Sequence, residues 1–129
     1  MTKMQVVCIQ MRPEFKNKAK SIQRAEALLD ELSGPVDLIC LPEMALVGYR
    51  FENSEDVAPY SEAVPADISA IVDQIDQGIS EEVKEGEQRC SFRWALEVSK
   101  RFTLAWVAVG FVERDHQNRF FNSALLVNH

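Results

Sequence analysis

The stretch LICLPEMALVGYRF, residues 38–51, joins a short apolar run to an abrupt polar exit. Because a proline disfavours the helical conformation of the residue before it, Pro42 should keep Leu41 extended. The apolar residues before the proline therefore predict a short buried strand over 36–41. Glu43 follows the proline directly, which places a carboxylate at the carboxyl end of that strand.

Two roles for Glu43 are open at this point. Ligand sites of parallel α/β sheets lie at the carboxyl ends of the strands, and apolar neighbours such as Met44, Leu46 and Val47 would partly desolvate the carboxylate. A desolvated carboxylate is well suited to proton transfer. The alternative is structural, because a glutamate at the start of a helix complements the positive end of the helix dipole.

The residues on either side of this stretch predict an α/β fold. The apolar, β-branched run over 4–11 predicts a strand that is buried on both faces. Apolar residues at steps of three and four predict a helix over 16–32, which Gly34 and Pro35 would end. Together with the strand over 36–41, these elements form a βαβ unit whose two strands should run parallel.

The second half of the chain completes the layout. Pro65 should open a short helix that Gly78 ends, and another helix is expected over about 88–102. Apolar runs over 104–112 and 120–127 predict two more strands. Only a short polar link separates these strands, so they should form an antiparallel hairpin.

The chain has 129 residues, of which 47% are hydrophobic, and a formal net charge of −6. These values are typical of one globular domain and argue against nucleic acid or an anionic membrane as a partner. Eleven of the 20 acidic residues fall between Glu52 and Glu87, where Lys84 is the only basic residue. We expect a solvated acidic segment over about 60–88, with residues 77–88 poorly ordered.

The sequence offers no signal for a membrane, a metal or a cofactor. No apolar run approaches the roughly 18 residues of a membrane helix, and the N-terminus lacks the cleavage pattern of a secretory signal, so we expect a cytoplasmic protein. The three cysteines match neither a disulfide framework nor a zinc pattern. Cys8 and Cys40 should be buried and behave as small hydrophobes. Solvated positions are expected for Lys16, Lys18, Lys20, Lys84, His116 and His129.

The motif Pro42-Glu43-x-x-Leu46-x-Gly48-Tyr49 resembles the first signature of the nitrilase, or carbon–nitrogen hydrolase, superfamily. The opening apolar run, the helix with its Gly-Pro stop, WVAVGFVER and FFNSALLVN are similar to successive elements of that family. The resemblance implies the N-terminal part of the family's α-β-β-α sandwich, as a partial domain over 1–129 with an acidic insertion at about 60–88. The family fold commonly self-associates, so the resemblance also implies a homo-oligomer.

The longer stretch LPEMALVGYRFENSEDVAPY is most similar to the N-terminal amidases of this superfamily. Those enzymes deamidate an N-terminal Asn or Gln of a protein, which feeds a degradation pathway. The resemblance implies that Glu43 is the general base and that Tyr49, Phe51 and Glu52 lie in the substrate site. Such a substrate carries a free α-amino group, which nearby carboxylates would bind. The candidates are Glu52, Glu55 and Asp56.

Family chemistry also uses a cysteine nucleophile and a lysine that stabilises the oxyanion, and both positions of the family pattern lie beyond Asn128-His129. None of the three cysteines stands at the family's cysteine position. We therefore expect either a truncated chain or a shortened paralogue, inactive alone in both cases. Two alternatives stay open: the same chemistry on a small-molecule amide or nitrile, or a catalytically inactive module for binding or dimerisation.

Overall fold

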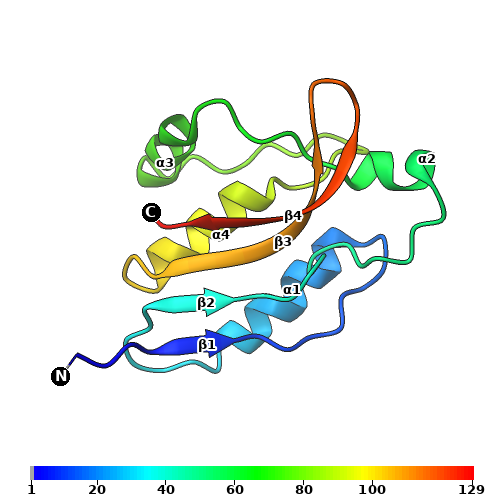
Figure 1. Cartoon of the computed structure of the whole chain (residues 1–129). Helices are drawn as coiled ribbons and strands as arrows, with labels where there is room; N and C mark the ends of the chain where they lie inside the picture. The colour runs from blue at the N-terminus through cyan, green and yellow to red at the C-terminus, as the bar shows by residue number, and fades with distance from the viewer. Residues whose placement is uncertain (1) are drawn as a thin grey trace.

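Residues 2–129 are described by the computed structural model, in which four strands form one sheet in the order β1-β2-β3-β4 (Figure 1). The strands are β1 (Val6–Cys8), β2 (Leu38–Cys40), β3 (Trp106–Arg114) and β4 (Phe120–Val127). β1, β2 and β3 run parallel, and β4 pairs antiparallel with β3. The βαβ unit and the final hairpin predicted from the sequence are thus confirmed.

The helices are α1 (Lys18–Leu29), α2 (Ser54–Val57), α3 (Ile68–Asp76) and α4 (Ser91–Arg101), with a 3₁₀ turn η1 (Ala58–Tyr60) after α2. α1 and α4 lie on the same face of the sheet, behind it in the view of Figure 1. The main core fills the space between these two helices and the sheet. Its fully buried members include Leu29, Ile39, Trp94, Val107 and Val109.

Helix α1 is shorter than the predicted helix over 16–32. Asn17 caps its first turn by accepting a backbone N–H with its side chain. The helix ends at Leu29 because the N–H groups of Glu31 and Leu32 donate to carbonyls three residues back, which tightens the last turn. Gly34 follows with φ +84°, as expected of a glycine that ends a helical segment.

Helices α3 and α4, both expected from the sequence, each turn an apolar face inwards. In α4 this face is buried, and in α3 it is half-buried. Asp67, rather than Pro65, caps α3 by accepting a backbone N–H, and Gly78 follows the helix with φ +71°. The residues are Phe92, Trp94, Ala95, Leu96, Val98 and Ser99 in α4, and Ile68, Ile71, Val72 and Ile75 in α3.

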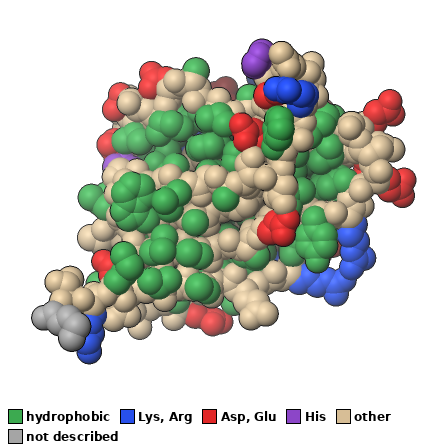
Figure 2. Space-filling model, viewed as in Figure 1, with side chains coloured by type: hydrophobic (Ala, Val, Ile, Leu, Met, Phe, Trp, Pro, Cys, Tyr) green, Lys and Arg blue, Asp and Glu red, His purple; other side chains and the backbone are tan. Residues whose placement is uncertain are grey.

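Two predictions about the first strand are wrong. β1 has three residues instead of the span 4–11, and Val6 and Cys8 are exposed rather than buried. The physical reason is that helices cover one face of the sheet, whereas the other face is bare within residues 2–129. We call it the open apolar face, and its hydrophobic side chains are visible in Figure 2. It is lined by Met4, Val6, Leu38, Trp106 and Leu126.

The acidic segment is not uniformly solvated, because Glu62 is tied into the fold. Its carboxylate forms an ion pair with Lys18, with a Nζ to Oε2 distance of 2.7 Å. It also accepts the backbone N–H of Ser91 at 2.6 Å and the hydroxyl of the same residue. Lys18 is only 2% exposed, so the prediction that it is solvated is wrong. We call this group the Lys18–Glu62–Ser91 cluster.

The cluster links three segments that are far apart in the sequence. Lys18 lies in the first turn of α1, and Ser91 begins α4. The backbone of Glu62 also pairs with β3, since its N–H donates to the carbonyl of Val112 and its carbonyl accepts the N–H of Arg114, both at 2.8 Å. The start of the acidic segment therefore forms an isolated parallel β-bridge with β3.

The end of the chain corrects one more prediction. His129 is half-buried rather than solvated, because the end of the chain after β4 lies beside α3. The Nε2 atom of His129 lies 2.7 Å from Oδ1 of Asp76 in that helix. The expected exposure of Lys20, Lys84 and His116 is confirmed. Poor ordering of residues 77–88 stays a prediction.

Candidate functional site

Glu43 lies at the carboxyl end of β2, as the sequence predicts, in a turn that crosses the neighbouring strand β3. Its carboxylate accepts a hydrogen bond from the side-chain amide of Asn122 on β4. The two side chains share a hollow of about 310 Å³, which we call the strand-end hollow. It is lined by Leu41, Glu43, Ala108, Val109, Gly110, Asn122, Ser123 and Ala124.

The expected desolvation of Glu43 by its neighbours is wrong. Met44, Leu46 and Val47 are buried, whereas Glu43 itself is exposed. The backbone explains the difference, because Met44 takes the left-handed conformation with φ +48° and sends the following residues into the core. Glu43 is left on the outside of this turn, where its carboxylate faces the hollow and solvent.

Gly110 in β3 determines how closely the Glu43 turn approaches the sheet. A Cβ atom at this position would lie 2.6 Å from the backbone nitrogen of Met44 and 2.9 Å from the Cα of Glu43. It would also lie 2.9 Å from the carbonyl oxygen of Pro42. The turn therefore packs directly on the backbone of β3. This packing fixes the position of the Glu43 Cα, from which the side chain extends.

The other predicted site residues lie together in a second hollow of about 390 Å³, the aromatic hollow. Tyr49, Phe51 and Glu52 all line it, and so does Asn122. Asn122 thus borders both hollows and connects the group of predicted binding residues to Glu43. The remaining lining residues are Met44, Asn53, Ser54, Val57, Val112, Phe120 and Phe121.

The aromatic residues of this region differ in how firmly they are held. The Phe51 ring lies 5.2 Å from the ring of Phe15 and 5.6 Å from that of Tyr60, measured between centroids. Tyr49, by contrast, is 70% exposed. Phe51 therefore forms a fixed wall of the aromatic hollow, and Tyr49 presents a free aromatic surface at its edge.

The three candidate carboxylates for an α-amino group are not equivalent. Asp56 forms an ion pair with Lys16, and this hydrogen bond together with one from the backbone N–H of Glu52 lowers the pKa of Asp56. The same contact raises the pKa of Lys16. Glu52 lines the aromatic hollow, whereas Glu55 and Asp56 do not. Glu52 is therefore the carboxylate of the three that can face a bound ligand.

No thiol accompanies Glu43 in the part of the chain that the structure describes. Cys8 and Cys40 are paired in register on β1 and β2, and Cys90 precedes α4. Burial raises the pKa of the Cys40 and Cys90 thiols, which favours the protonated form. Neither hollow is lined by a cysteine, lysine or arginine among residues 2–129.

The described residues also lack the features of other kinds of site. No group of three or more His, Cys, Asp or Glu side chains between positions 2 and 129 could hold a metal ion. None of the helices described is both long enough and apolar enough to cross a membrane.

Asn122 is the residue that the sequence reasoning missed. Its contact with Glu43 spans 79 positions, so no local pattern reveals it. The available signal is its chemistry, because Asn122 is an amide in the mostly apolar strand FFNSALLV. In the register of the hairpin, Asn122 lies opposite Val112, two residues from Gly110.

Comparison with known proteins identifies the family of the chain. The family model for carbon-nitrogen hydrolases matches residues 5–129. The chain is 28% identical over 130 residues to the protein N-terminal amidase of Saccharomyces cerevisiae, covering 97% of this chain and 23% of that protein. It is also 28% identical over 128 residues to the protein N-terminal amidase of Schizosaccharomyces pombe, covering 94% and 37%. The chain therefore spans about a quarter to somewhat over a third of the length of these relatives.

Solved structures of an N-terminal amidase have the same fold over this region. One crystal structure superposes with a TM-score of 0.70 at 27% sequence identity, and another, with a Gln-Val peptide, has a TM-score of 0.72 at 26% identity. Each match covers 97% of this chain and 25% of the other. Since the family model matches nearly every residue and the fold agrees, this chain belongs to the carbon–nitrogen hydrolase family.

Proposed function

We propose that this chain is part of a protein N-terminal amidase, which hydrolyses the side-chain amide of an N-terminal Asn or Gln and releases ammonia. The observation that carries the proposal is the pairing of Glu43 with Asn122 at a strand end, next to a hollow lined by Tyr49, Phe51 and Glu52. The similarity to N-terminal amidases over 97% of the chain supports the same activity.

Glu43 is proposed to act as the general base. It is exposed to the hollow, and it accepts one hydrogen bond from Asn122. A carboxylate has about four lone-pair sites, so acceptor capacity is left for the proton of a nucleophile. Asn122 would act as a positioning residue, because its amide holds the carboxylate towards the strand-end hollow.

The substrate is proposed to lie across the aromatic hollow. Glu52 would form a charge-assisted hydrogen bond with the substrate's α-amino group, since Asp56 is already engaged by Lys16. Phe51 would supply an apolar wall against the aliphatic part of the side chain. The thiol that attacks the amide and the cation that stabilises the oxyanion are required by the same chemistry. We propose that both lie outside the described residues.

The test measures ammonia release by the full natural chain from peptides that begin with Asn or Gln. Replacing the proposed base, Glu43→Gln, should lower turnover by roughly 10²- to 10⁴-fold, the usual contribution of a general base. Glu55→Gln is the matched control, because Glu55 is a nearby acidic residue that lines neither hollow. Near-normal turnover of the Glu43 variant would remove the assignment.

A second experiment distinguishes a protein N-terminal amidase from the two alternatives, a small-molecule amidase or nitrilase and a catalytically inactive module. Acetylating the α-amino group of the peptide should abolish turnover, and Glu52→Gln should raise KM for the free peptide more than it lowers kcat. Equal turnover of acetylated peptides or of small amides and nitriles would favour the small-molecule alternative. Absence of ammonia release from every substrate, with peptide binding or self-association retained, would favour the inactive module.

A further inference from the structure

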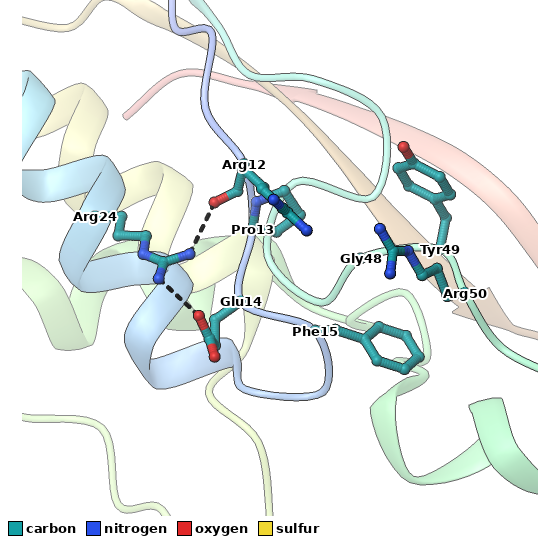
Figure 3. Close-up of a pocket in the computed structure, with 8 residues that line it drawn as sticks. All are labelled: Arg12, Pro13, Glu14, Phe15, Arg24, Gly48, Tyr49 and Arg50. Atoms are coloured by element: carbon teal, nitrogen blue, oxygen red, sulfur yellow. Dashed lines mark hydrogen bonds and ion pairs between the residues drawn. The ribbon is translucent and has the colours of Figure 1, made fainter.

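A third hollow lies on the other side of Tyr49 and is distinguished by its arginines (Figure 3). It has a volume of about 380 Å³, and we call it the arginine hollow. Tyr49 lines both this hollow and the aromatic hollow, so the two are adjacent. Its other lining residues are Arg12, Pro13, Glu14, Phe15, Arg24, Gly48 and Arg50.

The three arginines of this hollow are in different electrostatic states. Arg24 donates to the carboxylate of Glu14 at 2.6 Å and to the backbone carbonyl of Arg12 at 3.0 Å. Its charge is therefore balanced within the protein. Arg12 and Arg50 form no ion pair with any carboxylate among residues 2–129. Figure 3 shows their guanidinium groups pointing towards one another across the hollow.

This arrangement fits a carboxylate ligand. Two guanidinium groups that face each other repel, and an anion between them would turn the repulsion into two attractive contacts. A guanidinium presents a planar fork of N–H donors that matches the two oxygens of a carboxylate. What distinguishes Arg12 and Arg50 is that both line one hollow without an ion pair of their own within the described part of the chain.

We propose that the arginine hollow binds a carboxylate of the peptide substrate beyond its N-terminal residue, which makes Arg12 and Arg50 determinants of substrate preference. This inference rests on the proposed function, because it is the adjacent aromatic hollow that would hold the N-terminal residue. Tyr49, which is 70% exposed between the two hollows, would contact the peptide backbone as it passes from one to the other. The carboxylate is either an acidic side chain or the carboxyl terminus of a short peptide.

The test compares peptides that begin with Asn and carry a single Glu or Gln at the second, third or fourth position. Their carboxyl termini are amidated, and one further pair has a free carboxyl terminus, so the two sources of carboxylate are separated. Equilibrium binding is measured by calorimetry and ammonia release in parallel, both with the full natural chain. At low salt, the favoured Glu peptide should bind about 3- to 10-fold more tightly than its Gln counterpart, as expected for charge-assisted contacts at an exposed site.

Arg12→Gln and Arg50→Gln should each reduce this preference, raise KM for the Glu peptide and leave kcat nearly unchanged. The matched control is Arg101→Gln, which removes the same charge from an exposed arginine that pairs with Asp30 and lines none of the three hollows. Added salt should also weaken the preference, because it screens exposed charges.

The outcomes separate the inference from the proposed function. Normal ammonia release with equal binding of the Glu and Gln peptides would overturn the carboxylate subsite alone. A Glu preference that is lost in Arg12→Gln and Arg50→Gln, but with no ammonia release from any peptide, would support the subsite and overturn the amidase activity. A preference that survives in both variants would show that the carboxylate binds elsewhere and would overturn the inference.

Discussion

Two glutamates of this chain are placed in opposite environments. Glu62 has a side chain that is 12% exposed and accepts hydrogen bonds from Lys18 Nζ and from the N–H and hydroxyl of Ser91. Glu43 is exposed and accepts one hydrogen bond, from Asn122. Both follow apolar or aromatic residues closely in the sequence, so the sequence around them does not separate the two roles.

The comparison teaches how a carboxylate is assigned to structure or to chemistry. Glu62 uses its acceptor capacity within the fold, where an opposite charge and two further donors compensate the cost of burial. Glu43 keeps acceptor capacity free, because Asn122 holds its carboxylate by a single hydrogen bond while packing against Gly110 fixes its backbone. A general base has to be held in place while its carboxylate stays free to accept a proton, and packing of the turn contributes to this.

The largest effect on stability is expected from breaking the buried ion pair between Lys18 and Glu62. Lys18→Met would leave the Glu62 carboxylate buried without its opposite charge and should lower the free energy of unfolding by about 3–5 kcal/mol. Chemical denaturation of the full natural chain measures the change. Lys20→Met is the control, because Lys20 lies in the same turn of α1 and is exposed.

The double variant Lys18→Met with Glu62→Leu sharpens this test. Removing both charges together should recover much of the lost stability, since replacing a buried ion pair by apolar residues is often nearly neutral. Equal destabilisation by Lys18→Met and Lys20→Met would show that the Lys18–Glu62–Ser91 cluster does not stabilise the fold.

The next largest effect is expected at Gly110. In Gly110→Ala, the added methyl group would meet the Pro42–Met44 backbone at 2.6–2.9 Å, so the turn has to move. The free energy of unfolding should fall by about 1–3 kcal/mol, as for other overpacked sites. Turnover should fall as well, because Glu43 moves with its backbone. Unchanged stability and unchanged turnover would contradict the close packing of the turn on β3.

Replacing Glu43, the exposed glutamate, should affect turnover far more than stability. Glu43→Gln is expected to change the free energy of unfolding by less than about 0.5 kcal/mol, the usual range for surface substitutions, while turnover falls steeply. Thermal and chemical unfolding, measured beside the ammonia assay, check both halves of the statement. A large loss of stability would mean that Glu43 is a structural residue like Glu62.

The smallest effect concerns a third carboxylate, Asp115, in the turn between β3 and β4. Hydrogen bonds from the backbone N–H and the side chain of Arg119, at 2.9 and 2.7 Å, and from the N–H of Gln117 hold its pKa below the ordinary value of 3.8. A lowered pKa means that the contribution to stability is present above pH 3.8 and is lost as the pH falls through the lower folded-state value.

Asp115→Asn should therefore cost a small amount of stability at neutral pH, where the native carboxylate is ionised, and make progressively less difference as the pH falls through the folded-state pKa. Unfolding at a series of pH values measures this dependence on pH, and a carboxyl titration by nuclear magnetic resonance measures the pKa directly. A pKa at or above the ordinary value would contradict the turn contacts.

Local patterns were sufficient to predict the four strands, the helices α1, α3 and α4 and their order along the chain, but not the short helix α2 or the turn η1. The periodicity of α4, the hairpin of β3 and β4 and the position of Glu43 after β2 all follow from neighbouring residues. The sequence could not indicate that β1 has an exposed face, because its residues are apolar on both sides. Such a pattern describes what a strand could bury, and not which of its faces other elements cover.

The contacts that distinguish the glutamates depend on residues far apart in the chain. Lys18 and Glu62 are separated by 44 positions, and Glu43 and Asn122 by 79. A lysine in the first turn of an amphipathic helix is ordinarily solvated, so only the folded arrangement reveals its burial. The facing guanidinium groups of Arg12 and Arg50 were missed for the same reason.

The open apolar face gives the molecule two separate fluorescent reporters. Of the two tryptophans, Trp94 is 1% exposed in the core, with its indole N–H donated to Glu26 at 3.2 Å, and Trp106 is 46% exposed on the open apolar face. Anything that covers this face shifts the emission of Trp106 to shorter wavelengths and protects it from a collisional quencher. Trp94 keeps its emission until the core itself opens. Intrinsic fluorescence thus distinguishes covering of the face from unfolding of the core.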